Sequence, residues 1–374
     1  MWSIALKTLV SDRGKLLTAV VGVVFSVVLV NIQGGLFIGL IKKASLLVEQ
    51  GDADVWVGHK KMNNVDFPHD IPRSWEQRIQ TVDGVDRAEP YVVGHSVMTL
   101  PDGGFEQVLV VGCDPASLLG GVNPEACPDA HCLRQGDGIL VDVCDIDKIG
   151  NPQLGDVREI GQRRAKIVGF TNGVLGFLVT PYVFTTLDRA AGFVHKPSSR
   201  VSYFLVQVRD GFDPQAVCDG IRRRLPDAEA FTRDKYSGES IKYWLSRTGL
   251  GISFGASTLL GLAVGLMIVA QTLYASVLDR LAEIGALKAM GARESQVLGL
   301  ILRQAIALAA LGSVIGMMLV MIAKALFSTP RAPIEIPWVM AAGSCALVTI
   351  ICLASSLLPY LRVRRIDPAM VLQG

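Results

Sequence analysis

The sequence predicts a membrane protein with four transmembrane α-helices and a large α+β extracytoplasmic domain between helices 1 and 2. Of its 374 residues, 50% are hydrophobic and 19% are charged, and the mean hydropathy is +0.41. This composition is too apolar for a disordered chain. The apolar residues gather in four long uncharged stretches, and a polar segment of mixed composition separates the first two. This distribution excludes an ordinary soluble enzyme.

Each of the four stretches reaches the length of about 20 residues that a membrane-spanning helix needs. A backbone in lipid must satisfy its own hydrogen bonds, so helices are expected there. The expected spans are residues 16–41, 248–278, 304–323 and 336–361. The first apolar run is longer than the ~7–15 residues of a signal peptide's apolar core, and no A-x-A site follows it, so we expect it to be retained.

Basic residues are unevenly distributed among the short connecting segments. The N-terminal segment 1–15, the loop 279–303 and the tail 362–374 together hold ten Lys and Arg residues, whereas the loop 324–335 holds two. Since basic loops stay on the cytoplasmic side of a membrane, both termini and the loop 279–303 are expected in the cytoplasm. The segment 42–247 is then expected outside.

The external segment 42–247 mixes strand and helix signals. Alternation predicts strands, and proline near a first turn predicts helices from Pro72 and over 213–225. The sequence Pro101-Asp-Gly-Gly104 predicts a hairpin between its flanking strands. The expected strands are 52–58, 91–100, 105–111, 165–170, 178–184 and 201–208. An inserted lobe rich in Gly, Asp and Pro is expected at about 113–164.

The tightest cysteine cluster is Cys127-Pro-Asp-Ala-His-Cys132. Outside the cytoplasm a disulfide between Cys127 and Cys132 is favoured, although free thiols remain an alternative. A metal site that also uses His131 is disfavoured, because no second ligand pair has zinc-like spacing. Seven cysteines in the whole chain are too few for a disulfide scaffold.

Four histidines stand apart in the external segment: His59, His69, His95 and His195. No G-x-S-x-G, H-E-x-x-H or other nucleophile–base pattern accompanies them. They are therefore expected to be ordinary surface or core histidines. We expect no catalytic residue, no cofactor-binding residue and no metal site on this chain, and a net charge of +2 gives no reason to expect nucleic-acid binding.

The loop after the second span combines an apolar face with charges. The second apolar run holds 31 residues, about 46 Å as a helix, which exceeds the ~30 Å hydrocarbon core, so its end should project as a stalk. Ile284, Leu287 and Met290 then recur at helical spacing, and Gly291 can end the short helix. Such a helix can lie on lipid or dock in a groove of another protein.

The residues E-I-G-A-L-K-A-M-G-A at 283–292 resemble the loop after the second transmembrane helix of FtsX-like, MacB-type (type VII) ABC transporter permeases. The tail R-R-I-D-P-A-M-V-L at 364–372 resembles that family's ending. The N-terminal segment 1–15 resembles its amphipathic cytoplasmic helix. The order of one span, a MacB-like external domain and three spans is similar along the whole chain. Within the family the chain looks most like the DevC-type branch.

This resemblance implies a coupling helix at about 283–291 that sits in a cleft of an ATP-binding subunit. Ile284, Leu287 and Met290 would fill the cleft. The implied ATPase-docking residues are Glu283, Ile284, Gly285, Leu287, Lys288, Met290, Gly291 and Arg293. In the tail, Asp367 suits a helix N-cap and Pro368 suits the first helical position. The tail also holds Arg364. The alternative is an ordinary turn with solvated charges.

The implied function is that of a permease subunit of an ABC-type exporter, which transmits ATPase-driven motion to its periplasmic domain by mechanotransmission. The cargo would be a lipid, glycolipid or peptide. The implied partners are an ABC ATPase, a second permease copy in a homodimer, an HlyD-like adaptor and membrane lipid, in a bacterial inner membrane. Because no G-x-x-x-x-G-K-[ST] phosphate loop occurs, ATP is expected on the separate ATPase subunit. The alternative is an FtsX-like regulator that relays ATPase motion to periplasmic cell-wall enzymes without moving cargo.

The spans themselves carry few polar residues and no charge, which argues against an ion-coupled carrier. Three Gly-x-x-x-Gly pairs permit close helix approach. They are Gly35 with Gly39, Gly261 with Gly265, and Gly312 with Gly316. They could form a seam between two copies or pack within one subunit, and the sequence leaves both alternatives open.

Overall fold

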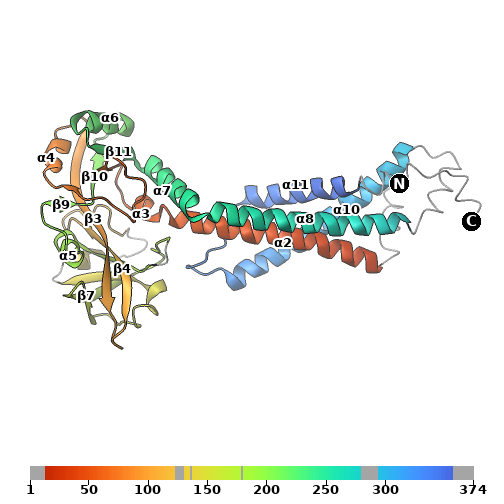
Figure 1. Ribbon diagram of the computed structural model, residues 1–374, viewed down its shortest axis with the longest axis horizontal. Coiled ribbons are helices and arrows are strands. Elements are labelled where there is room, and N and C mark those ends of the chain that lie inside the picture. The colour runs from red at the N-terminus through yellow and green to blue at the C-terminus, as the bar shows by residue number, and fades with distance from the viewer. Residues whose placement is uncertain (1–12, 123–129, 135–136, 178–179, 279–293, 357–374) are drawn as a thin grey trace, which may run out of the picture. The chain divides into compact units, whose positions relative to one another are not determined.

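The structure is a computed structural model that describes residues 13–122, 130–134, 137–177, 180–278 and 294–356. The chain divides into two compact units (Figure 1). The unit Leu40–Leu250 is called the external unit after the location expected from the sequence, and the helical unit comprises Met1–Gly39 with Gly251–Gly374.

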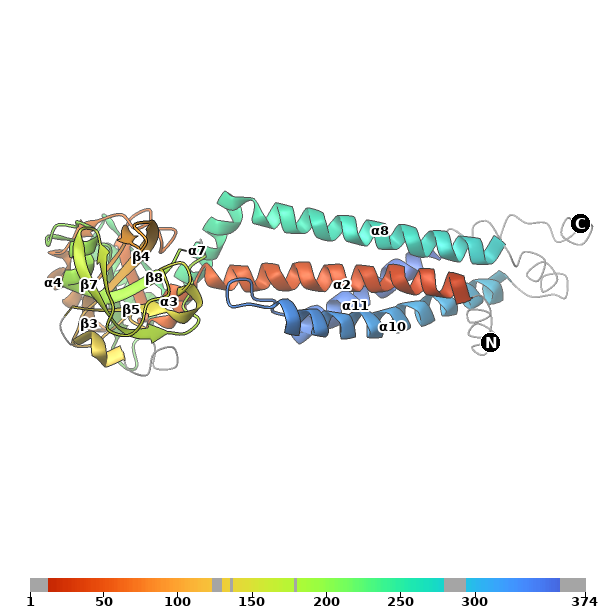
Figure 2. The ribbon, with the colours of Figure 1, turned by 90° about the horizontal axis from the view of Figure 1, so that it is seen from below.

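The helical unit consists, in its described part, of α2 (Arg13–Lys43), α8 (Leu250–Leu278), α10 (Glu294–Phe327) and α11 (Trp338–Ser355). Four helical segments are long and apolar enough to cross a membrane: Leu16–Lys43, Leu250–Thr272, Leu298–Phe327 and Trp338–Ser355. The expected number and order of candidate spans are thereby confirmed, with bounds that differ by several residues from the expected ones. Figure 2 shows α8 and α10 as long continuous helices. The third helix extends past its apolar run at both ends, because charged residues near a membrane surface can remain helical.

The Gly-x-x-x-Gly pairs pack within this one chain. An added Cβ would lie 1.5 Å from Ser26 Oγ at Gly265 and 2.4 Å from a Leu29 methyl at Gly261. At Gly312 and Gly316 it would meet the side chains of Val23 and Val27 at 2.4 and 2.8 Å. Four of the six glycines therefore allow α8 and α10 to approach α2. The Gly35 and Gly39 pair lies against the segment 333–336.

A polar contact joins α2 to α11 inside the helical unit. The Asn31 side-chain amide donates to Ser344 Oγ at 2.8 Å and to the Val27 carbonyl at 2.8 Å. Asn31 is fully buried and Ser344 is 3% exposed. In an apolar surrounding each group needs the other as a partner, so the pair sets the register of the two helices.

The external unit is an α+β domain, as expected. Its helices are α3 (Leu46–Gln50), α4 (Trp75–Gln80), α5 (Leu187–Phe193), α6 (Pro214–Arg224) and α7 (Arg233–Thr248), with 3₁₀ turns η1 (Ala130–Arg134) and η2 (Val143–Asp145). Its strands are β1 (Val55–His59), β2 (Ile71–Pro72), β3 (Val85–Thr99), β4 (Phe105–Cys113), β5 (Gly138–Asp142), β6 (Val157–Ile160), β7 (Arg163–Thr171), β8 (Tyr182–Thr186), β9 (Arg200–Val201), β10 (Tyr203–Val208) and β11 (Ala228–Thr232).

Nine strands form one sheet in the order β11-β1-β10-β3-β4-β8-β5-β7-β6. The strand β6 also pairs with β3 through Met98 and Ile160, so six of the strands form a closed ring. The long strand β3 belongs to both this ring and the four-stranded part β11-β1-β10-β3 (Figure 1). The expected hairpin is present, since β3 and β4 pair out to Thr99 and Phe105.

The four-stranded part separates two layers of side chains. Val55 and Val57 of β1 pack with α4 and α6 on one face, and Trp56 packs with α3 and α7 on the other. This alternation follows from the two-residue period of a strand. The helices α3 and α7 therefore share one face of the sheet.

Three expected elements differ in the structure. The strand expected at 178–184 is β8, which spans Tyr182–Thr186. The helix expected from Pro72 begins at Trp75, because Ile71–Pro72 forms β2 and pairs with Arg200 and Val201, which fits the extended backbone favoured before proline. The described residues of 113–164 do not form a separate lobe. Their strand β5 is wholly buried between β8 and β7, so this stretch supplies part of the domain core. The expected helix at 213–225 is confirmed as α6, whose first amides are capped by Asp213.

Candidate functional site at the α3–α7 junction

Most of the functional residues expected from the sequence lie outside the described residues. These are the eight coupling-helix residues between Glu283 and Arg293, the tail residues Arg364, Asp367 and Pro368, the segment 1–12, and Cys127. Their roles, including the Cys127–Cys132 disulfide, therefore stay predictions. Cys132 itself lies in η1, which contacts β5, β7 and β8.

The chain enters the external unit from α2 through α3 and leaves it through α7 into α8. One carboxylate joins these two segments. Glu49 Oε1 accepts hydrogen bonds from Ser45 Oγ of the α3 N-cap at 2.6 Å and from Ser237 Oγ of α7 at 2.8 Å. We call Ser45, Glu49 and Ser237, with the aromatic residues that hold α7 on the sheet, the α3–α7 junction.

Buried aromatic residues fix α7 to the sheet. The Tyr236 hydroxyl donates to the Tyr203 hydroxyl at 3.1 Å, and the Tyr203 hydroxyl donates to the Asn64 carbonyl at 2.9 Å. Trp56 packs against both tyrosine rings at centroid distances of 5.6 Å. All three rings are essentially inaccessible to solvent. Burial of such large rings in a close-packed cluster resists displacement of α7 from the sheet.

A second aromatic contact holds the C-terminal half of α7. Trp244 lies 4.2 Å from the Phe177 ring centroid at an interplanar angle of 30°, and its centroid is 6.1 Å from that of Phe67. Trp244 is 5% exposed and packs in a small cluster with Ala44 and Phe177. The helix α7, which precedes the second candidate span, is therefore attached to the domain at two levels.

A carboxyl group is buried beneath this cluster. Asp66 is 4% exposed, and its Oδ1 accepts a hydrogen bond of 2.8 Å from the Tyr182 hydroxyl. Burial raises the pKa of Asp66 from 3.8 to about 6, and the bond from Tyr182 opposes this rise only in part. The Asp66 amide donates to Asn64 Oδ1, which fixes the turn that also meets Tyr203.

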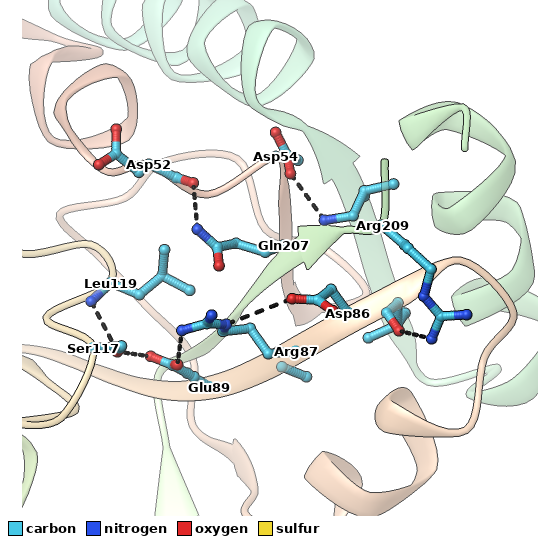
Figure 3. A network of polar contacts seen from close by, with 12 residues as sticks. Asp52, Asp54, Asp86, Arg87, Glu89, Ser117, Leu119, Gln207 and Arg209 are labelled. Atoms are coloured by element: carbon cyan, nitrogen blue, oxygen red, sulfur yellow. Dashed lines mark hydrogen bonds and ion pairs between the residues drawn. The ribbon is translucent and has the colours of Figure 1, made fainter. Parts of the chain in front are cut away.

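A network of polar contacts holds the segment after α3 (Figure 3). The Val208 amide of β10 donates to Asp54 Oδ2 at 2.9 Å, and Gln207 Nε2 donates to the Asp52 carbonyl at 3.5 Å. In the same network Glu89 of β3 accepts a hydrogen bond from Ser117 and lies 3.8 Å from Arg87. Its pKa is raised chiefly by burial. The contacts of Asp52 and Asp54 tie the end of β10 to the segment that precedes β1.

The four histidines are not isolated in space, contrary to the expectation. His69, His95 and His195 line one cavity of about 540 Å³, and the His59 ring lies 5.3 Å from that of His69. Burial lowers the pKa of His95. The cavity also reaches α7 through two side chains, Tyr243 and Arg247. The sequence could not show this gathering, because the lining comes from four segments that only the fold brings together.

Among the described residues, no group of three or more His, Cys, Asp or Glu side chains is placed to hold a metal ion.

Part of the helical unit is similar to a known protein family. Residues 255–368 match the family described as FtsX-like permease C-terminal. The chain is also 25% identical over 225 residues to uncharacterised ABC transporter permeases of Mycobacterium bovis and Mycobacterium tuberculosis. These alignments cover 59% of this chain and 58% of each relative, so the chain spans less than two thirds of the length of the curated relatives it matches.

Two solved structures are similar to part of the chain. The periplasmic region of MacB from Actinobacillus actinomycetemcomitans is 10% identical, with a TM-score of 0.36 over 53% of this chain and 94% of that one. The extracellular domain of the noncanonic ABC-type transporter YknZ from Gram-positive bacteria is 10% identical, with a TM-score of 0.34 over 48% and 98%. TM-scores this low carry no argument about function. The family match is thus the informative comparison: residues 255–368 are similar to the C-terminal region of FtsX-like permeases, and the chain is similar to ABC transporter permeases.

Proposed function

We propose that this chain is the permease subunit of an ABC-type exporter and transmits ATPase-driven motion to its external domain by mechanotransmission. The observation that carries the proposal is the FtsX-like permease region at 255–368, which follows an α+β domain inserted between the first and second candidate spans. The similarity to ABC transporter permeases supports it. The chain would not itself be an enzyme, and ATP would bind to a separate ATPase subunit.

The proposed route of force begins at the coupling helix, residues 283–291. Ile284, Leu287 and Met290 would occupy a cleft of the ATPase, and the flanking charges would orient the helix. The helix α8 has 29 residues, about 44 Å at ~1.5 Å per residue, which makes it a suitable lever. Gly249 separates α7 from α8 in a left-handed conformation, with φ of 64°.

The α3–α7 junction would receive the motion in the external domain. Glu49 links the two segments that enter and leave the domain, and Tyr236 and Trp244 hold α7 on the sheet and on Phe177. A displacement of α7 would therefore act on the sheet rather than on a loose loop. This arrangement favours transmission through a rigid contact over diffusion of cargo between the helices.

The remaining features of the proposal concern partners and location. The complex would comprise two permease copies, two ATPase subunits and an HlyD-like adaptor, in a bacterial inner membrane with both termini in the cytoplasm. The cargo would be a lipid, glycolipid, peptide or similar molecule. Substrate would be moved by the external domain with the adaptor.

The test uses the full chain co-expressed with the ABC ATPase subunit that the proposal requires. Leu287→Glu places a charge on the apolar face and should abolish both copurification of the ATPase and ATP-dependent transport, whereas Leu287→Met should preserve both. Gly291→Pro should likewise uncouple transport. Intact binding and transport in Leu287→Glu and Gly291→Pro would refute the coupling assignment.

An FtsX-like regulator without cargo is the second candidate, because the match of residues 255–368 to FtsX-like permeases is compatible with either function. Deletion of the adaptor distinguishes the two functions. An exporter should lose function without the adaptor, whereas a regulator should lose function only without a periplasmic cell-wall enzyme.

A further inference from the structure

A second cavity of the external domain gathers basic side chains that the junction does not use. Its volume is about 270 Å³, just below the ~300–1,000 Å³ typical of ligand pockets. The basic residues that line it are Arg73, Arg163, Lys196 and Arg200, and the acidic residue among the lining is Asp188. These cations come from three different parts of the chain, so the fold itself creates the cluster.

Local structure holds the arginines in place. Pro72 of β2 pairs with Arg200 of β9, and the Arg73 amide donates to the Ser199 carbonyl at 2.9 Å, so Arg73 and Arg200 start from adjacent strands. Arg163 begins β7 and lies against α5. A Cβ added at Gly192 would be 2.6 Å from Arg163 Nη1, so only a residue without a side chain lets the guanidinium lie there.

The charges at this cavity are incompletely balanced. Lys196 is neutralised, because its Nζ donates to the Asp70 carboxylate and its side chain is only 7% exposed. Arg73 has a weak solvent-exposed partner in Glu76 at 4.0 Å. Among the residues that the structure describes, no carboxylate lies within 4.0 Å of the guanidinium of Arg163 or Arg200.

Cationic groups around one partly enclosed cavity repel one another, and a bound anion relieves that repulsion. A guanidinium presents its N–H donors in a planar fork that suits the oxygens of carboxylates and phosphates. A carboxylate is satisfied by one such fork. Guanidinium groups that approach from two sheet segments, β7 and β9, instead suit an anion with oxygens in several directions.

We propose that the cavity lined by Arg73, Arg163 and Arg200 binds a phosphate group. The phosphate could belong to a water-soluble phosphate ester or to the headgroup of an anionic lipid, since the two present the same oxygens. Arg163 and Arg200 contact the phosphate oxygens, and Arg73 supplies long-range attraction. This proposal rests on the external domain alone and does not depend on the permease function.

The test is a titration of the purified full-length chain in detergent with inorganic phosphate, at constant ionic strength set by chloride, followed by calorimetry. Binding should be saturable, and Arg163→Gln and Arg200→Gln should each weaken it at least tenfold. Arg164→Gln is the matched control: it removes the same charge one residue along β7, where the side chain lines a different cavity. It should leave the affinity within about twofold, since only distant screened charge is lost.

A second variant tests the geometry without changing the charge. Gly192→Ala should displace the Arg163 guanidinium and weaken phosphate binding while the melting temperature without phosphate stays close to that of the parent chain. The proposal is overturned if phosphate binding is not saturable, if it is unchanged in Arg163→Gln and Arg200→Gln, or if Arg164→Gln weakens it equally.

Glycerol 3-phosphate and phosphatidic acid in mixed micelles then distinguish the sources. Equal affinity per phosphate assigns a soluble ester, and affinity at least tenfold tighter for phosphatidic acid assigns a lipid headgroup. Where phosphatidic acid binds more tightly, the difference must vanish in Arg163→Gln, since otherwise the lipid binds elsewhere and the lipid assignment fails.

Discussion

The buried carboxyl of Asp66 makes the stability of the external domain depend on pH in a predictable direction. Its pKa is raised from 3.8 to about 6, so the folded state holds the proton more tightly than the unfolded chain does. The stabilisation from the protonated form is complete below pH 3.8 and is lost as the pH rises through about 6. At ~1.36 kcal/mol for each unit of pKa, the whole effect is about 3 kcal/mol.

The perturbation is Asp66→Asn, which removes the titration and keeps an oxygen that can accept from Tyr182. Relative to the parent chain, the variant should gain about 1 kcal/mol in unfolding free energy between pH 5 and pH 7 and little more above pH 7. The quantity to measure is the change in the stability difference between variant and parent from pH 5 to pH 7. Any cost of the new amide that does not depend on pH cancels in this change. Because only 4% of the Asp66 surface is exposed, solvent screens the carboxyl little, and the full pKa shift can be converted to a free energy.

The assay is urea unfolding of the full chain in detergent at pH 5, 6, 7 and 8, followed by tryptophan fluorescence. Trp56 packs beside Tyr203 and so reports on this region. The control is Asp83→Asn, which removes an exposed carboxylate. A stability difference between Asp66→Asn and the parent chain that is the same at pH 5 and pH 7 would refute the reasoning.

Three further substitutions test the junction and the helical unit. Glu49→Ala should lower the unfolding free energy by about 1–3 kcal/mol through loss of two hydrogen bonds to a charged acceptor, and should reduce ATP-driven transport more than Glu49→Gln does; equal transport in both variants would contradict a role for Glu49. Gly265→Leu should lower the melting temperature in detergent sharply, whereas Gly255→Leu on the same helix, where no atom lies within 4 Å of an added Cβ, should not; similar melting of the two would exclude close packing on α2. Ser344→Ala should destabilise the helical unit by about 1 kcal/mol because Asn31 loses its partner, and an unchanged melting temperature would show that water or lipid satisfies Asn31.

The number and order of the spans could be predicted from the sequence because lipid imposes one rule on every spanning segment. A long uncharged run such as 16–41 has no stable alternative to a helix in hydrocarbon. The hairpin at Pro101-Asp-Gly-Gly104 and the helix at 213–225 were also predictable, since both depend on neighbouring residues alone. The coupling helix at 283–291 remains a prediction from the sequence.

Other features depend on contacts between distant residues and were not predictable. The stretch 113–164 looked like a separate lobe, yet its strand β5 lies inside the sheet between β8 and β7. The Gly-x-x-x-Gly pattern permits close packing but does not name the partner, and only the structure shows that Gly265 meets Ser26 of α2. A local pattern determines what a segment can do, whereas the partner is chosen by the whole fold.

The sequence by itself determined the layout of four spans with a domain between the first two, the α+β class of that domain, and the resemblance to FtsX-like permeases. Tertiary structure alone decided that Glu49 joins α3 to α7, that Asp66 is buried beside Tyr182, and that Arg163 and Arg200 line one cavity. The physical reason is the range of the interactions. Hydrophobic length and turn chemistry act within a few residues of the chain, but burial, shifted pKa values and clustered charge arise only when remote segments are packed together.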